Sequence, residues 1–103
     1  MTKFVLTITT ADKIHVSFLQ RKNKILKFSV HYAALINKRW VSIIRYDTAH
    51  IFWKLPHKHL FYTKKKPVII FEKEQNYNIL FTKAYEDIKK NYRKYKDNYL
   101  TNK

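Results

Sequence analysis

Three of the five histidines in this sequence lie within ten residues of one another: His50, His57 and His59. Imidazole titrates near neutral pH, so a histidine can serve as general base or general acid at physiological pH. Asp47 precedes them by three residues, and a carboxylate can fix which ring nitrogen of a histidine carries the proton. Cleavage of RNA needs a base for the 2′-hydroxyl and an acid for the leaving oxygen. We therefore expect these four residues to be the catalytic groups of a ribonuclease that uses no metal ion.

Basic and aromatic residues surround the candidate catalytic groups. Arg45 and Lys58 can hold a phosphate and stabilise the charge that develops during its transfer. The expected nucleic-acid-binding residues are these two together with Tyr46 and a run of three lysines, Lys64, Lys65 and Lys66. A non-enzymatic nucleic-acid-binding module is the alternative function, in which the same charges contact phosphates and the histidines are incidental.

Two further interpretations of these residues stay open. Arg45 and Asp47 are two positions apart on one strand, so they can form a structural ion pair while the histidines are ordinary surface residues. Alternatively, His57 and His59 bind a metal ion together with His50, because a His-x-His pair on a strand is a valid ligand arrangement for zinc, copper, nickel or iron. The spacing matches no familiar metal motif, and we expect neither a metal nor a cofactor.

The composition restricts the function further. The 103 residues include 22 Lys and Arg against 7 Asp and Glu, a formal net charge of +15 that is spread along the chain. Such a charge favours RNA, another polyanion or an acidic protein as the partner. The absence of glycine excludes the phosphate-binding loops of P-loop and dinucleotide-binding proteins, and the absence of cysteine excludes disulfides and thiolate sites. No apolar run is long enough for a membrane span, so we expect a cytoplasmic protein without a membrane partner.

Alternating apolar and polar residues predict the strands that must position these groups. In the third predicted strand, Leu26 faces inward with three other even-numbered apolar residues. In the fourth, residues 39–46, alternation puts Trp40 on the face of Ile44 and Tyr46, which predicts Trp40 in the core. Further strands are predicted at 57–62 and 68–71. Because successive strands are joined by short polar turns, they are expected to form an antiparallel meander.

From about Tyr77 to Tyr99 the apolar period changes to three and four residues, which is typical of a helix. Asn76 or Asn78 is expected to be its N-cap. The predicted fold is therefore α+β: one domain, residues 1–103, with an antiparallel sheet meander over about 3–71 packed against one long C-terminal helix over about 77–99.

The run Arg45-Tyr46-Asp47, then His50, then His57-Lys58-His59 resembles the "YDN…H-[RK]-H" core of the TumE-like toxins of toxin–antitoxin modules. The likeness extends over about residues 13–95, since a small sheet followed by a helix is also similar. In this sequence Thr48 stands at the position of the usual Asn. The resemblance implies a small cytoplasmic toxin paired with a helix-turn-helix or acidic antitoxin protein.

Overall fold

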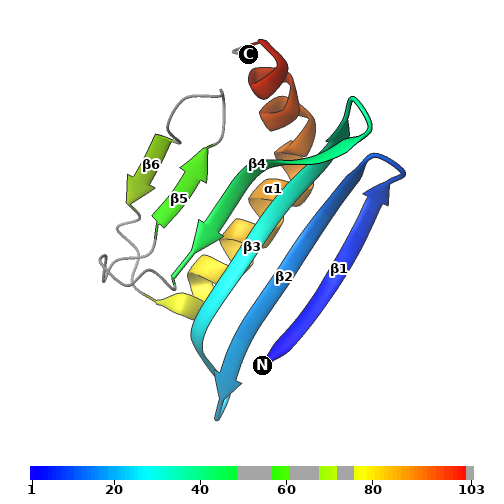
Figure 1. Cartoon of the computed structure of the whole chain (residues 1–103). Helices are drawn as coiled ribbons and strands as arrows, with labels where there is room; N and C mark the ends of the chain where they lie inside the picture. The colour runs from blue at the N-terminus through cyan, green and yellow to red at the C-terminus, as the bar shows by residue number, and fades with distance from the viewer. Residues whose placement is uncertain (49–56, 61–67, 72–75, 102–103) are drawn as a thin grey trace.

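The computed structural model describes residues 1–48, 57–60, 68–71 and 76–101, with side chains described for 1–48 and 76–101. In these described residues, six strands form one antiparallel sheet in which the spatial order equals the chain order, and one helix follows (Figure 1). This confirms the predicted α+β meander with a C-terminal helix. The elements are β1 (Thr2–Thr9), β2 (Asp12–Arg21), β3 (Lys24–Ile36), β4 (Arg39–Asp47), β5 (His57–Leu60), β6 (Val68–Phe71) and α1 (Tyr77–Thr101).

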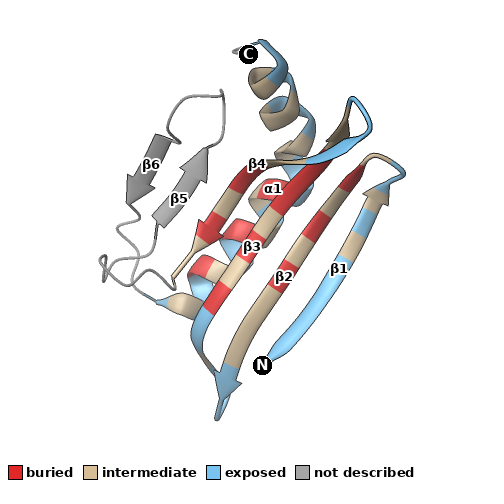
Figure 2. Cartoon of the chain, viewed as in Figure 1, coloured by how far each residue is buried: buried red, intermediate tan, exposed pale blue. Residues whose placement is uncertain are grey.

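α1 lies across one face of the sheet, behind the strands in Figure 1, and packs against β3 and β4. Its buried residues, Leu80, Ala84 and Ile88, are spaced by four, so they form one stripe along the helix. Figure 2 shows that the buried stretches of α1 lie behind the buried middle of the sheet, in β2, β3 and β4. The strands contribute alternate residues such as Val30 and Ile44, both fully buried. In the described part of the chain, no helix is long and apolar enough to cross a membrane.

The start of α1 is fixed by two asparagines with different roles. Asn76 is the N-cap, because its Oδ1 accepts hydrogen bonds from the backbone N–H of Asn78 and Ile79 at 3.0 and 3.2 Å. Asn78 instead joins the helix to the turn between β2 and β3. Its Oδ1 accepts from the N–H of Ile25 at 2.8 Å, and its Nδ2 donates to the carbonyl of Asn23 at 3.0 Å.

Each of the first three hairpins contains one register shift close to its turn. A two-residue turn such as Asn37–Lys38 pairs even-numbered residues with odd-numbered ones, for example Ala34 with Val41. The residues that face α1 on β3 and β4, such as Tyr32 and Ile44, are even-numbered, and direct partners must share a face. One extra residue in one strand resolves this conflict.

These bulges overturn two predicted core positions. In β4 the extra residue is Ile43, so Trp40 pairs with Leu35 and lies on the face opposite to Ile44, with 44% of its surface exposed. In β3 the extra residue next to the turn is Leu26, which is 47% exposed. Simple alternation cannot detect an inserted residue, and everything between the bulge and the turn changes face.

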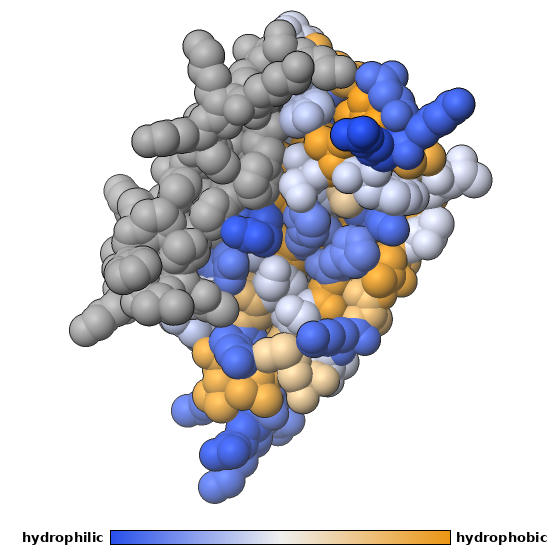
Figure 3. Space-filling view, in the orientation of Figure 1, coloured by the Kyte–Doolittle hydropathy of each residue, from blue (hydrophilic) through white to orange (hydrophobic). Residues whose placement is uncertain are grey.

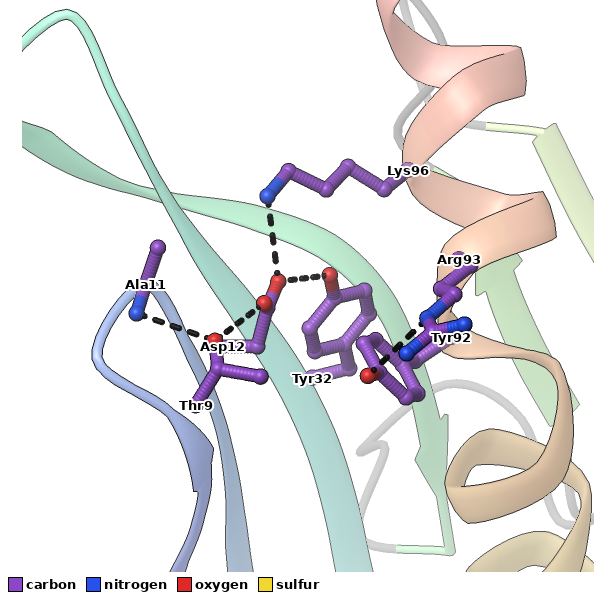
Figure 4. Close-up of polar contacts among 7 residues, drawn as sticks. All are labelled: Thr9, Ala11, Asp12, Tyr32, Tyr92, Arg93 and Lys96. Atoms are coloured by element: carbon purple, nitrogen blue, oxygen red, sulfur yellow. Dashed lines mark hydrogen bonds and ion pairs between the residues drawn. The ribbon is translucent and has the colours of Figure 1, made fainter.

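Two carboxylates, Asp12 and Asp87, join α1 to the sheet. Asp12, which is 5% exposed, accepts hydrogen bonds from the hydroxyls of Thr9 and Tyr32, both at 2.5 Å, and pairs with Lys96 of α1 at 3.3 Å (Figure 4). Burial alone would raise the pKa of Asp12, but these three donors outweigh it and lower the pKa below its usual 3.8. On the helix, Asp87 accepts from the hydroxyl of Tyr46 at 2.7 Å.

Candidate functional site

The face of the sheet that α1 does not cover, here called the open face, carries most of the polar strand residues. Successive residues of a strand point to opposite faces of the sheet, so each residue of the open face is adjacent in sequence to a residue that faces α1. In Figure 3, which looks onto this face, hydrophilic side chains gather over the middle of the sheet and apolar ones lie toward its rim. Its polar residues in β2, β3 and β4 include Lys13, His15, Ser17, Lys27, Ser29, His31, Ser42, Arg45 and Asp47.

The strand register lines up four of the basic residues. His15 is paired with His31, His31 with Arg45, and Arg45 with the backbone position of His59 in β5. We call these four residues the cross-strand row. Direct partners in antiparallel strands have Cβ atoms about 4.5–5.5 Å apart. The meander therefore converts residues that are 14 to 16 positions apart in sequence into one line perpendicular to the strands.

A second line runs beside the cross-strand row. Ser29 is paired with Asp47, and Asp47 with the backbone position of His57. The end of β4 is held by Thr48, whose hydroxyl accepts from the N–H of Phe28 at 2.8 Å and donates to the carbonyl of Phe28 at 3.1 Å. These two hydrogen bonds to the backbone of Phe28 in β3 fix the position of Asp47 at the end of β4.

His31 is a half-buried titratable group of the open face. Its Nε2 is 2.8 Å from Oγ of Ser42, and its ring stacks on that of His15 with the centroids 5.7 Å apart. Burial lowers the pKa of His31 to about 4, and the neighbouring charges of His15 and Arg45 act in the same direction. The pKa of His15 is also lowered, by burial and then by Lys13. At pH 7 His31 is therefore a neutral imidazole.

Arg45 and Asp47 form the ion pair that their spacing allowed, with Nε of the arginine 3.5 Å from Oδ2 of the aspartate. The Arg45 side chain is 36% exposed and the Asp47 side chain 14%. The guanidinium has five N–H donors in a planar fork, a geometry that suits both carboxylates and phosphates. This pair thus provides an oriented cation on the open face.

Tyr46 points the other way from Arg45 and Asp47. Its side chain is 9% exposed, belongs to the core cluster and donates its hydroxyl to Asp87. The two adjacent residues of the Tyr46-Asp47 motif therefore lie on opposite faces of the sheet.

The other predicted site residues are only partly covered by the structure. His57, Lys58 and His59 are placed by their backbone register alone, opposite Asp47, Tyr46 and Arg45 in that order. The predicted residues that lie outside the described residues are His50, Lys64, Lys65 and Lys66.

Sequence reasoning missed His15 and His31 as members of the site. Nothing in their local sequence distinguishes them from surface histidines. The signal that would have found them is the register, because pairing the even-numbered core residues of β2 and β3 also pairs His15 with His31.

The open face combines a neutral imidazole, a positioned guanidinium and a carboxylate within two neighbouring registers. Such a set can bind a phosphate and accept or return a proton. Among the side chains that the structure describes, no three His, Cys, Asp or Glu residues are grouped to hold a metal ion.

Comparison with known proteins gives one match. No curated protein and no solved structure matches the chain. A family model described as a domain of unknown function, DUF7718, matches residues 1–103. The chain therefore belongs to the DUF7718 family.

Proposed function

We propose that this protein binds RNA on the open face of its sheet and cleaves it by acid–base chemistry without a metal ion. The observation that carries the proposal is the register of β4 and β5, in which the backbone positions of His59 and His57 lie directly opposite Arg45 and Asp47. A phosphate held by Arg45 would therefore lie beside two histidine positions of one strand. Two histidines near one phosphate are what catalysis by a base and an acid requires.

The net charge supports binding to a polyanion. With +15 on 103 residues, the molecule attracts RNA over the Debye length of about 8 Å at physiological salt. Arg45 and Lys13 bring part of this charge to the open face. The face also carries half-buried neutral polar groups, including Ser17 and Ser29, and serine hydroxyls are typical phosphate and sugar contacts.

The proposed reaction is an internal transesterification. The 2′-oxygen forms a bond to phosphorus while the bond from phosphorus to the 5′-oxygen breaks. A histidine takes the 2′-hydroxyl proton, and a second one, protonated, gives a proton to the leaving oxygen. His57 and His59 are the candidates for these roles together with His50, and Asp47 would orient His57. Arg45 and Lys58 would stabilise the negative charge on the phosphorane.

In the cell we propose a toxin-like role in the cytoplasm, with an acidic or helix-turn-helix antitoxin as the protein partner. Such a partner would silence the protein by covering the open face. The main support for this is the large unbalanced positive charge, which an acidic surface complements.

Binding without cleavage is the second candidate function. The observation that favours it is that side chains of the open face are held by one another: Arg45 forms an ion pair with Asp47, and His31 is hydrogen-bonded to Ser42. Groups held in this way suit a rigid binding surface as well as a catalytic site.

The test is a binding and cleavage assay with a labelled single-stranded RNA in the presence of EDTA. We expect the parent to cleave with chelator present, and Arg45→Gln to weaken binding and to reduce the log–log salt slope by about 0.7–0.9. Lys89→Gln is the matched control, because Lys89 is an exposed cation on α1. It should reduce binding less than Arg45→Gln.

The outcomes separate the candidates. Binding without cleavage would leave the second candidate function. Cleavage that is lost in EDTA and restored by zinc or manganese would replace the mechanism by a metal-dependent one. A parent that does not bind RNA would refute both candidates.

A further inference from the structure

Trp40 is an exposed indole on the open face, and neither the proposed catalytic groups nor the core uses it. It is paired with Leu35 of β3, and 44% of its surface is exposed. The bulge at Ile43 puts it there, because without the extra residue Trp40 would lie on the side of α1. Its indole therefore offers a large, partly exposed aromatic surface on the same face as Arg45 and His31.

Lys13 of β2 holds the indole in place. Its Nζ lies 3.9 Å from the centroid of the Trp40 ring. Lys13 is paired with Ala33 of β3, so the two side chains meet across the intervening strand. Ala33 lies on the open face but is only 4% exposed, because the side chains of Lys13 and Trp40 meet above it. The indole is thus ordered by a cation on one side while a large part of its surface remains open to solvent.

We propose that Trp40 is a base-stacking residue that selects single-stranded RNA. This inference rests on the proposed function. It adds recognition of a base, whereas Arg45 would bind the phosphate. An indole offers a flat apolar surface on which any base can stack, and stacking requires a base that is free of a duplex. Lys13, beside the ring, adds a cation for the phosphate of the same nucleotide.

The distance from Trp40 to the cross-strand row suits one strand of RNA. Leu35 and His31, the β3 partners of Trp40 and Arg45, are four residues apart, which is about 13 Å along a strand. A base stacked on Trp40 and a phosphate at Arg45 would then belong to the same short stretch of RNA. The open face would therefore read the strand at two points, one by stacking and one by charge.

The experiment compares two probes of equal length and charge: oligouridylate of twelve nucleotides and its abasic ribose-phosphate analogue. Both carry a 2′-O-methyl group at every position, so that the 2′-oxygen cannot attack the phosphate and the oligomers bind without being cleaved. We expect Trp40→Ala to weaken binding of the oligomer with bases by about 5- to 100-fold, and to change binding of the abasic oligomer by less than twofold. The salt slope should stay the same, since no phosphate contact is lost.

Two controls test whether the effect belongs to this indole. Phe4 is an exposed aromatic, 42% accessible, that is paired with Val16 on the α1 side of the sheet, so Phe4→Ala should leave both affinities unchanged. Thermal melting checks that Trp40→Ala is folded, and Trp40→Phe should retain part of the preference for bases. In a Trp53→Phe background, the base-containing oligomer should quench the remaining tryptophan emission and the abasic one should not.

The results distinguish this inference from the proposed function. If the parent binds both oligomers and Trp40→Ala weakens both equally or neither, the stacking role is wrong while RNA binding stands. If the parent binds neither oligomer and no other single-stranded RNA, the proposed function fails and the stacking role with it.

Discussion

His31 and Ser42 are joined by a contact of 2.8 Å between Nε2 and Oγ, although Ser42 is the register partner of Ala33 and not of His31. The bulge at Ile43 separates Ser42 from Arg45, the partner of His31, by one residue more than a regular strand would. His31 consequently has Arg45 directly opposite and Ser42 diagonally opposite. The bulge thus shapes the open face as well as the core.

Because His31 is partly buried, we expect the folded protein to lose stability as the pH falls. Its pKa is about 4 in the folded chain against 6.5 when exposed, so the unfolded chain binds the proton first as the pH falls. The stability that this neutral imidazole contributes is complete above pH 6.5 and is lost progressively toward pH 4. We expect the parent to lose about 2 kcal/mol between pH 7.5 and 5 from this group.

Denaturant unfolding at these two pH values measures the effect. His31→Gln should show a smaller loss of stability between them, and His15→Gln, at the less enclosed neighbour, should resemble the parent more closely. If His31→Gln loses as much stability as the parent over this range, His31 is not held neutral by the fold.

Asp12 should be the most sensitive carboxylate for stability. Asp12→Ala leaves the buried hydroxyl of Tyr32 without its acceptor and breaks the link to Lys96 of α1. We expect a loss of about 2–4 kcal/mol, measured by urea unfolding. Asp97→Ala is the control, because Asp97 is an exposed carboxylate on the same helix, and it should cost less than about 0.5 kcal/mol.

The pH profile offers a second test of the Asp12 cluster. The lowered pKa of Asp12 means that its contribution is present above about pH 4 and is lost as the pH falls below that value. Burial and the bond to Asp12 raise the pKa of Tyr32 above 10, so the fold should also weaken as the pH rises beyond about 10. A parent with equal stability at pH 3 and pH 7 would contradict this account.

Tyr46 and Asp47 should separate stability from activity, because they lie on opposite faces of β4. Tyr46→Phe removes the hydrogen bond to Asp87 and should cost about 1–2 kcal/mol of stability with no change in cleavage by the folded protein. Asp47→Asn should reduce cleavage by about 10- to 100-fold if Asp47 orients a histidine. Melting and RNA cleavage are measured on both variants. The opposite pattern, in which Tyr46→Phe is the inactive variant, would place the site on the α1 face.

Periodicity predicts the elements of this chain because the sheet and the helix bury their apolar faces against each other. The stripe of Leu80, Ala84 and Ile88 defined α1, and the alternation of Val30 and Tyr32 defined β3. In the part of the chain whose side chains the structure describes, the predicted faces are correct where β3 and β4 are regular.

The errors at Trp40 and Leu26 share one physical cause. A two-residue turn pairs even-numbered residues with odd-numbered ones, whereas the core residues of both strands are even-numbered. A bulge must therefore lie between the turn and the core, and this need can be recognised from the sequence. The position of the bulge is not readable, because it depends on which residues pack best next to the turn. The same limit hid the candidate site, since only the register brings His15, His31 and Arg45 into line.

The absence of glycine leads to a last prediction about stability. Among the residues that the structure describes, four have positive φ, and two of them, Asn37 at 51° and Lys38 at 65°, form the turn between β3 and β4. Two positive φ values are typical of the type I′ turn, which favours Asn-Gly. Asparagine tolerates this region, whereas lysine has a Cβ that crowds the following carbonyl at a cost of about 1–2 kcal/mol.

Lys38→Gly should therefore stabilise the protein. The relief of strain exceeds the extra backbone entropy of glycine in the unfolded chain, about 0.5–1 kcal/mol, so the net gain is about 0.5–1 kcal/mol. The matched control is Lys27→Gly, which removes the same charge from an exposed position inside β3 and should destabilise by about 0.5–1 kcal/mol. Both are measured by urea unfolding against the parent. If the two variants shift stability in the same direction, the turn stores no strain at Lys38, and the positive φ there carries no energetic cost.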